Sequence, residues 1–538
     1  MALPITCVVD ASQPSSDEHT INTHLISLLH TFSNFESDEE SRHRIQVLGK
    51  IYQLFKEWCF QKILKRPGMN EEMAKSATCQ IFTFGSYRLG VHGPGTDLDI
   101  LCVSPRYITR EEFERDMYEV LKKQPCVSKI TSVFTAKVPL IKMIFDGVPI
   151  DLLFASLAGY DRIPEEMLDL LDDNAMSRLD EKTTLSLNGP RNTDMTLSLV
   201  PNLDNFRLTL RVVRLWAKRR GVYSNVLGFP GGYAWSIMVA KVCKMYPNYL
   251  PSQLIRKFFK VYDMWDWNQA VFLKQVEQMA GNSSEPGVMM VMTPAPPSFN
   301  STYSVNKHSK QAICEEFHLA NKVTSSIEEG KTTWNDLFEP IDFFAQFNHF
   351  LKVEILASTS SDFEDWSGFV LSKLRILFYD NLGDLKPSPY VRVLPEEIDI
   401  SDSKYQFAVA YYAGLKFFKQ NTAESGKSVD LRIPVLKFIE MIYKMRRENG
   451  YNVANCNLRV RYLEASDLGE EIGKMPNPSI KKRFRSFDDS VDPEKKAKLE
   501  DGKTFESLPE PVVTSIQNVN PVVVGQQKKL TFNFKGKK

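Results

Sequence analysis

The chain has 538 residues, and its 67 lysines and arginines nearly balance its 66 aspartates and glutamates, which leaves a formal net charge of +1. This length suggests about three domains. The balanced charge excludes a uniformly basic chain, so any surface for nucleic acid must be local. The eight cysteines lack the paired spacing of a zinc site and the density of a secreted disulfide framework, and no apolar run reaches the ~18 residues of a membrane span. We expect a protein of the cytosol or nucleus with reduced thiols.

The first pattern along the chain is helical. In HLISLLHTF and RIQVLGKIYQLFKEWCFQKIL apolar residues recur every three or four positions, which predicts helices within residues 20–75. Residues 80–157 then contain short β-rich runs, CQIFTF, LDILCV, KVPLIKMIF and VPIDLLFASL, around one helical run, TREEFERDMYEVLKK. This alternation predicts a compact α/β module with a mixed sheet. Helical patterns return from about residue 160 to 345.

The segment from 349 to 465 predicts the element order βαββαβ. The runs HFLKVEIL, PYVRVL, YQFAVAYYAGLKFF and NLRVRYLEA are predicted strands, and FEDWSGFVLSKLRIL and PVLKFIEMIYKMRRE are predicted helices. This order is typical of the ferredoxin-like fold of many RNA-recognition modules, but their aromatic signature is missing, so base stacking on this sheet is not supported. Beyond residue 470 the composition predicts a disordered tail. Its two basic clusters between Lys481 and Lys498 are either a nuclear-import signal or a solvated tail.

The stretch FGSYRLGVHGPGTDLDILCV, residues 84–103, carries the first chemical signal. Side chains alternate between the two faces of a strand, so Asp97 and Asp99 point to one face while Leu98 and Ile100 point to the other. We expect one face to be core and the other to be acidic. Two adjacent carboxylates repel each other unless a cation lies between them, and hard oxygen ligands suit Mg²⁺. A turn, a helix cap or a calcium loop is the alternative for an isolated pair of aspartates.

The residues before this strand favour a phosphate site over that alternative. QIFTF is a predicted strand that ends at Gly85 and Ser86, and SYRLGV is a predicted short helix with Ser86 at its N-cap. Glycine lets the backbone approach a phosphate, and the free N–H groups at a helix start bind anions. The sequence therefore predicts a phosphate cradle beside a metal site.

A third carboxylate follows from strand register. In KVPLIKMIFDGVPIDLLF the pair Asp146 and Gly147 is a strong signal for a two-residue hairpin loop. Pairing outward from this loop places Lys142 opposite Asp151 on one face. The charge of Asp151 interrupts an apolar run and needs a cation, because an unpaired buried charge costs several kcal/mol. Either Asp151 is a metal ligand with Lys142 near a phosphate, or the two form a structural ion pair.

Three carboxylates beside a phosphate cradle suit two-metal phosphoryl transfer. Asp97 and Asp99 are placed to bridge both ions, and Asp151 to bind the ion on the hydroxyl side and to help remove the hydroxyl proton. The motifs FGSYRLGVHGPGTDLD, VPIDLLF, SLNGPR, LVPNLDNFRLTLRVVRLWAKRRGVYSN, GFPGGYAW and NSTYSV closely resemble those of eukaryotic nuclear poly(A) polymerases, members of the polymerase-β-like nucleotidyltransferase superfamily. The resemblance runs from about residue 20 to 465. It implies an α/β nucleotidyltransferase domain, a helical central domain and a ferredoxin-like, RRM-like C-terminal domain of the α+β class.

A helix in the middle of the chain has a basic face, because Arg207, Arg211, Arg214 and Lys218 recur at helical spacing. A solvated amphipathic helix is the alternative. The resemblance favours contact with a triphosphate, since Arg214 stands where the family normally has a phosphate-binding lysine. Arginine keeps the charge but differs from lysine in geometry.

The resemblance also assigns contacts to substrates. Besides the three aspartates, the implied ATP contacts are Phe84, Gly85, Ser86, Asn188, Arg214, Tyr223, Asn225, Gly232 and Tyr233, and the implied RNA contacts are Lys137 and Lys142. Most members have a small aliphatic residue at the position of Tyr233, and many have an aromatic residue at that of Lys137. We expect Tyr233 either to stack on the base or to crowd its pocket, and binding of the primer to depend more on salt.

The resemblance implies a template-independent polymerase that adds AMP from ATP to the 3′-hydroxyl of RNA, with two Mg²⁺ or Mn²⁺ ions per active site. It further implies mRNA polyadenylation in the nucleus with cleavage and polyadenylation factors, and we expect a monomer without membrane contact. Two alternatives stay open: a terminal nucleotidyltransferase of another base preference, such as a uridylyltransferase, and a non-catalytic RNA-binding relative. The expected divisions are an N-terminal extension (1–19), a helical segment packing with the central domain (20–75), the catalytic domain (76–160), the central domain (161–348), the RRM-like RNA-binding domain (349–468) and the tail (469–538).

Overall fold

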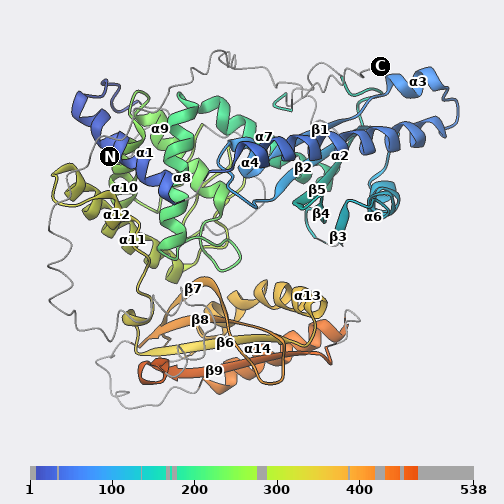
Figure 1. Ribbon diagram of the computed structural model, residues 1–538. Helices are drawn as coiled ribbons and strands as arrows, with labels where there is room; N and C mark the ends of the chain where they lie inside the picture. The colour runs from blue at the N-terminus through green and yellow to red at the C-terminus, as the bar shows by residue number, and fades with distance from the viewer. Residues whose placement is uncertain are drawn as a thin grey trace.

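The fold has three parts, which we call the N-terminal domain (described residues within 35–164), the helical domain (8–32 and those within 170–347) and the C-terminal domain (those within 348–469). In Figure 1 the first two lie side by side and the third lies below them. The computed structural model describes residues 8–32, 35–134, 136–164, 170–172, 179–274, 287–385, 388–417, 431–448 and 453–469. Within these ranges no helix has the length and apolar character needed to cross a membrane. From residue 470 onward the predicted tail, with its two basic clusters, lies outside the described residues.

The N-terminal domain is built on a sheet of five strands in the order β1-β2-β5-β4-β3. β2 and β5 pair in parallel and the other neighbours pair antiparallel, which confirms the predicted mixed sheet. Sequence patterns missed β3, because this edge strand exposes several polar residues and has no apolar alternation. The strands are β1 (Gln80–Phe84), β2 (Leu98–Pro105), β3 (Val127–Val133), β4 (Leu140–Phe145) and β5 (Val148–Leu157).

Both faces of this sheet are packed, which corrects the expectation of one apolar and one acidic face. Leu98 and Ile100 pack in one core with Phe55 of helix α2, whereas Leu101 and Val103 belong to a second core on the other face. The acidic residues therefore occupy only the beginning of β2, where the second core ends. The helices of this domain are α2 (Asp38–Leu64), α3 (Glu71–Ser76), α4 (Gly85–Leu89), α5 (Arg110–Glu112), the π-helical turn η1 (Phe113–Met117) and α6 (Tyr118–Lys122).

The helical domain surrounds an aromatic core. Trp216 meets Trp235 edge-on with ring centroids 5.8 Å apart, and it stacks on Phe317 at 5.7 Å. Helix α1 packs on α10 and α12, whereas α2 lies in the core of the N-terminal sheet. The helices are α1 (Ser16–Thr31), α7 (Glu181–Leu199), α8 (Leu203–Arg219), α9 (Gly232–Met245), α10 (Pro251–Asp263), α11 (Lys307–Glu328), α12 (Trp334–Leu337) and the short 3₁₀ turn η3 (Phe344–Gln346).

The C-terminal domain has the predicted βαββαβ order. Its four strands lie antiparallel in the order β7-β8-β6-β9, which is the strand order of the ferredoxin-like fold. The elements are β6 (His349–Ala357), α13 (Ser360–Leu371), the π-helical turn η4 (Ile376–Asn381), β7 (Tyr390–Asp399), β8 (Phe407–Lys416), α14 (Arg432–Glu448), β9 (Cys456–Glu464) and the 3₁₀ turn η5 (Ala465–Asp467).

A buried ion network fixes the C-terminal domain to the helical domain. Glu316 of α11 accepts hydrogen bonds from Arg392 of β7 at 2.6 Å and from Arg220 after α8 at 2.7 Å. The side chains of Glu316 and Arg392 are only 1% and 4% exposed. Because two guanidinium groups share one buried carboxylate, removing that carboxylate leaves two cations uncompensated.

We predict that Glu316→Ala destabilises this joint by about 3 to 5 kcal/mol, the usual cost of breaking a buried pair by removing one partner. Differential scanning calorimetry of the full chain measures this as a lower temperature for the transition that includes the C-terminal domain. Glu315→Ala is the matched control, because Glu315 lies on the same helix but its side chain is 48% exposed and 3.9 Å from Arg392. Equal melting of the two variants would contradict the prediction.

Candidate active site

The three predicted carboxylates meet at one edge of the N-terminal sheet. Asp99 of β2 and Asp151 of β5 are direct partners in the parallel pair, and Asp97 lies just before β2. One carboxylate oxygen from each aspartate lies within 4.8 Å of the others. Asp97 is exposed and the other two are half-buried. Three hard oxygen donors at this spacing fit a divalent cation such as Mg²⁺ or Mn²⁺.

The electrostatics of this cluster also fit a cation. Burial, together with the negative charges of Asp97 and Asp151, raises the pKa of Asp99 to about 7. Burial likewise raises the pKa of Asp151, although Lys142 opposes this shift. Without a metal the cluster therefore holds protons more strongly than exposed aspartates do, because its negative charges are poorly solvated and close together. A bound divalent cation relieves both effects.

The predicted register of the second hairpin is confirmed. Lys142 and Asp151 are cross-strand partners, and the Lys142 ammonium donates to both carboxylate oxygens of Asp151 at 2.9 and 3.2 Å. Asp151 thus belongs both to an ion pair with Lys142 and to the carboxylate cluster, so the predicted ion pair and the predicted metal site do not exclude each other. Lys137, the other predicted RNA contact, is exposed in the turn between β3 and β4.

Gly85 brings the backbone of α4 directly against Asp99. Its φ of +63° lies in the left-handed region, and a Cβ at this position would lie 2.0 Å from Oδ2 of Asp99. The helix begins at Gly85 and its N-cap is Phe84, without a side-chain cap, so the predicted N-cap role of Ser86 is wrong. The left-handed Gly85 turns the strand into the helix, so the N-cap lies two residues earlier than the sequence suggested.

Helix α7 places an unusually polar surface behind this turn. The amide group of Asn188 is 3% exposed, and neither its nitrogen nor its oxygen has a hydrogen-bond partner within the described part of the chain. Next to it, a Cβ on Gly189 would lie 2.8 Å from the ring of Phe84. Thr193 accepts a 3.4 Å hydrogen bond from the backbone N–H of Gly85. A buried amide without a partner costs free energy, so Asn188 fits a site that a polar ligand completes.

The loop between α8 and α9 lies against the start of α9. A Cβ on Gly232 would lie 2.6 Å from the Tyr223 hydroxyl, and one on Gly231 would lie 3.3 Å from Cβ of Asn225. The side-chain oxygen Oδ1 of Asn225 accepts a 2.8 Å hydrogen bond from the Ser304 hydroxyl. The structure therefore brings Tyr223, Asn225 and Gly232 together, as the sequence resemblance implied.

Tyr233 is tied to the neighbouring helix through its hydroxyl group. This group lies 2.9 Å from the Thr196 hydroxyl and donates to the backbone carbonyl of Asn192, also at 2.9 Å. Burial raises the pKa of Tyr233 well above its usual range. The side chain thus joins α9 to α7 close to Asn188, and its hydroxyl is committed to protein groups.

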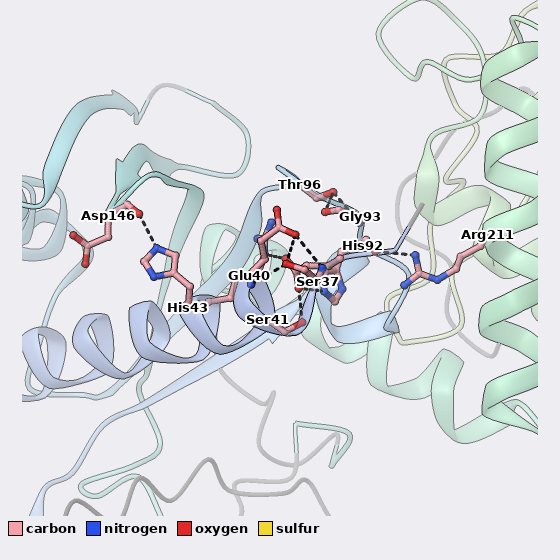
Figure 2. A network of polar contacts seen from close by, with 11 residues as sticks. Ser37, Glu40, Ser41, His43, His92, Gly93, Thr96, Asp146 and Arg211 are labelled. Atoms are coloured by element: carbon pink, nitrogen blue, oxygen red, sulfur yellow. Dashed lines mark hydrogen bonds and ion pairs between the residues drawn. The ribbon is translucent and has the colours of Figure 1, made fainter. Parts of the chain in front are cut away.

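The basic face of α8 binds backbone carbonyls. Arg214 donates to the carbonyl of Val91 at 2.8 Å, and its Nε is buried without a partner in the described residues. Figure 2 shows Arg211 reaching from α8 toward His92 in the loop that leads to Asp97. The further contacts are those of Arg207 with the carbonyl of Leu89 at 3.1 Å, and of Arg211 with the carbonyls of His92 at 2.8 Å and Gly90 at 3.0 Å. Guanidinium groups of the helical domain thus hold the four carbonyls ahead of the acidic strand.

Glu36 holds the same loop from the other side, and sequence reasoning missed it. Its carboxylate accepts from His92 at 2.9 Å, from Ser41 at 2.7 Å and from Arg44. Burial opposes ionisation of Glu36, but these hydrogen bonds outweigh it and lower the pKa of this carboxylate. For His92, burial is the largest effect and lowers the pKa of the imidazole. No motif marks Glu36, which directly precedes the capping box that Ser37 and Glu40 form at the start of α2 (Figure 2).

Comparison with protein families matches three consecutive parts of the chain. The poly(A) polymerase nucleotidyltransferase domain matches residues 5–200, the poly(A) polymerase central domain matches 205–340, and the poly(A) polymerase predicted RNA binding domain matches 342–386. The first range includes the N-terminal domain together with α1 and α7, the second covers most of the rest of the helical domain, and the third covers the first part of the C-terminal domain.

Curated proteins that are similar to this chain are poly(A) polymerases. The poly(A) polymerase of Dictyostelium discoideum is 38% identical over 536 residues, which cover 96% of this chain and 66% of that protein. Nuclear poly(A) polymerase 1 of Arabidopsis thaliana is 40% identical over 418 residues, which cover 75% of this chain and 57% of that protein. The matches therefore span about two thirds or less of these relatives. Among solved structures, the Cid1 poly(U) polymerase with Mg and 3′-dATP bound aligns with a TM-score of 0.42 and 14% identity over 60% of this chain and 99% of that one.

We predict that Asp99→Asn raises the melting temperature of the metal-free protein at neutral and higher pH. The Asp99 carboxyl ionises near 3.8 in the unfolded chain and at about 7 in the folded one, so stability falls as pH rises between these values and the penalty is complete above them. Thermal melts in EDTA across this range check the prediction. Mn²⁺ should then stabilise the wild type but not the variant. Asp399→Asn, at an exposed position of β7, is the control, and a lower melting temperature for Asp99→Asn than for the control would refute this account.

We predict that Gly85→Ala abolishes stabilisation by Mn²⁺, because the added Cβ would lie 2.0 Å from a carboxylate oxygen of Asp99. Gly147→Ala is a control with the same type of backbone strain, since Gly147 has a φ of +79° but nothing within 4 Å of its Cβ position. The measurement is the shift in melting temperature on adding Mn²⁺. If both variants keep the wild-type shift, the close approach of Gly85 does not position the metal ligands.

Proposed function

The chain belongs to the poly(A) polymerase family, and we propose that it is a template-independent polymerase that adds AMP from ATP to the 3′-hydroxyl of RNA and releases pyrophosphate. The observation that carries this proposal is the convergence of Asp97, Asp99 and Asp151 within 4.8 Å at one sheet edge. The matched nucleotidyltransferase and predicted RNA binding domains support the choice of nucleotide and RNA as substrates.

The three aspartates would hold two divalent cations, Mg²⁺ or Mn²⁺, which when bound stabilise the departing pyrophosphate and acidify the attacking hydroxyl. Asp97 and Asp99 would each be ligands of both cations. Asp151 would lie on the side of the RNA hydroxyl and accept its proton, because this carboxylate holds the ion that acidifies the hydroxyl. Lys142, 2.9 Å from Asp151, meets a phosphate of the RNA end.

The nucleotide binds against α4, α7 and the loops before α9. The backbone N–H of Ser86 faces the triphosphate at the start of α4, Gly85 lines the site through its backbone, and Phe84 closes the site beside Gly189. Asn188 gains the hydrogen-bond partner that its buried amide lacks. Arg214 adds positive charge near the phosphates through its unpartnered Nε.

The remaining contacts surround the sugar and the base. Tyr223 and Asn225 reach the sugar and phosphates, and Gly232 leaves room for adenine beside them. Tyr233 borders the base with its ring, because its hydroxyl is already bonded to α7. Lys137 binds the RNA backbone by charge, so primer binding weakens as salt rises.

We further propose that the protein works in the nucleus as a monomer in mRNA polyadenylation, together with cleavage and polyadenylation factors. Two Arabidopsis thaliana relatives, 40% and 37% identical to this chain, are named nuclear poly(A) polymerases. Polyadenylation consumes ATP and an RNA 3′ end, which are the substrates that the site accommodates.

Primer extension tests the activity. We expect the full chain to extend a labelled RNA oligonucleotide with ATP in the presence of Mg²⁺ or Mn²⁺, and much less with UTP, CTP or GTP. Asp97→Ala and Asp151→Ala should each lower the rate at least ~100-fold, because each variant removes a ligand of the metal ions that stabilise the transition state.

The control is Asp399→Ala, an exposed carboxylate on β7, which should extend the primer at the wild-type rate. Preferred incorporation of UTP would make the protein a uridylyltransferase instead. Binding of the primer without incorporation of any nucleotide would make it a non-catalytic RNA-binding relative.

A further inference from the structure

A second cavity of about 430 Å³ lies where the helical and C-terminal domains join. This volume falls in the range of sites for small organic ligands. The end of α8 supplies Lys218 and Arg219, and Tyr223 belongs to the loop that follows. The other walls come from the linker, residues 338–347, and from β7, where the strand register shifts between Leu394 and Ile398.

The joint around this cavity is rigid. The backbone N–H of Ile341 in the linker donates to the carbonyl of Arg219 at 2.8 Å, and Arg219 in turn donates to the carbonyl of Phe338 at 2.8 Å. The buried network of Glu316 and Arg392 lies in the same joint and fixes β7 against α11. The cavity is therefore formed before any ligand binds, which lowers the entropic cost of binding.

The lining combines apolar walls with both signs of charge. Ile341 of the linker and Leu394 and Ile398 of β7 provide apolar surface, and the last two are 7% and 3% exposed. The cations of the α8 end line the same cavity as the carboxylates of Asp342 and Glu396. A matching ligand has a flat apolar body, hydrogen-bond donors for carboxylates and an anionic group for Lys218.

We propose that this cavity binds an adenylate unit, either a nucleotide of the RNA chain upstream of its 3′ end or a free adenine nucleotide. The base lies between the apolar walls, its exocyclic amino group donates to Asp342, and its phosphate meets Lys218. The C-terminal sheet lacks the aromatic signature for base stacking, so this domain recognises RNA at its junction instead. The inference rests on the proposed function and adds a second site for its substrate class.

The carboxylates make the site selective among bases. Adenine and cytosine carry an exocyclic amino group that donates to a carboxylate, whereas uracil presents carbonyl oxygens at the corresponding positions. Uracil can donate to the carboxylate only through its ring N3–H, and the two carbonyl oxygens that flank this group repel the carboxylate. Occupancy therefore favours a tail of adenylates over a tail of uridylates.

Equilibrium binding of labelled oligo(A) and oligo(U) of equal length to the full chain in EDTA tests this selectivity without catalysis. We expect the wild type to bind oligo(A) more tightly. Asp342→Asn should reduce the ratio of the two affinities about tenfold, because the neutral amide makes a weaker hydrogen bond to the amino group and can itself donate to a uracil carbonyl. Ile341→Trp, which fills the cavity, should weaken binding of oligo(A) to a similar degree. Asp399→Asn, an exposed carboxylate of β7 outside the cavity, should keep the wild-type ratio.

Titration with AMP under the same conditions distinguishes the two sources of adenylate. Loss of one AMP-binding event in Ile341→Trp assigns the cavity to free nucleotide, whereas unchanged AMP binding with weakened oligo(A) binding assigns it to the RNA chain. Equal affinities of wild type, Asp342→Asn and Ile341→Trp for both probes overturn the inference, and so does an equal loss for oligo(A) and oligo(U) in Asp342→Asn. Incorporation of AMP by the same wild-type preparation separates failure of this inference from failure of the proposed function.

Discussion

The parallel pairing of β2 with β5 is the constraint on which the site depends. It makes Asp99 and Asp151 direct neighbours across two strands whose remaining residues fill two cores. Neither carboxylate can move away from the other without breaking this register, because a shift of one residue would exchange the buried and site-facing side chains of a strand. The fold therefore imposes a concentration of negative charge that solvent only partly screens. A divalent cation is the ligand that this constraint selects.

Neighbouring elements position the backbone next to this pair of aspartates. Gly85 lets α4 begin within contact distance of Asp99, and a Cβ at this position would displace the Asp99 carboxylate. The arginines of α8 hold the loop from Leu89 to His92, and Glu36, which lies just before α2, holds His92. The loop that ends in Asp97 is thus fixed from two domains. This arrangement explains why the basic face of α8 is needed even where it does not touch phosphate: it positions a metal ligand through the backbone.

The sequence predicted those parts of the site that follow from local rules. A two-residue hairpin loop fixes register, so the pairing of Lys142 with Asp151 was correct. Helical spacing correctly placed the arginines of α8 on one face, but spacing does not say what packs against a face, and the carbonyls that Arg207 and Arg211 bind come from about 120 residues earlier in the chain. The N-cap of α4 was misplaced by the left-handed turn at Gly85. Glu36 was missed because its burial depends on tertiary packing and leaves no pattern in the sequence.

The unmetallated site has an energetic cost that the rest of the chain must offset. The raised pKa of Asp99 means that its ionisation at neutral pH opposes folding, and the buried amide of Asn188 without a partner opposes it further. Ligands of opposite or complementary character would remove both costs: a cation for the carboxylates and, under the proposed function, a polar nucleotide group for the amide. Binding energy that relieves such costs stabilises the folded chain as well as the complex. The same residues that weaken the empty site therefore make the loaded site specific, because a ligand that lacks either the cation or the polar group leaves one of the two costs in place.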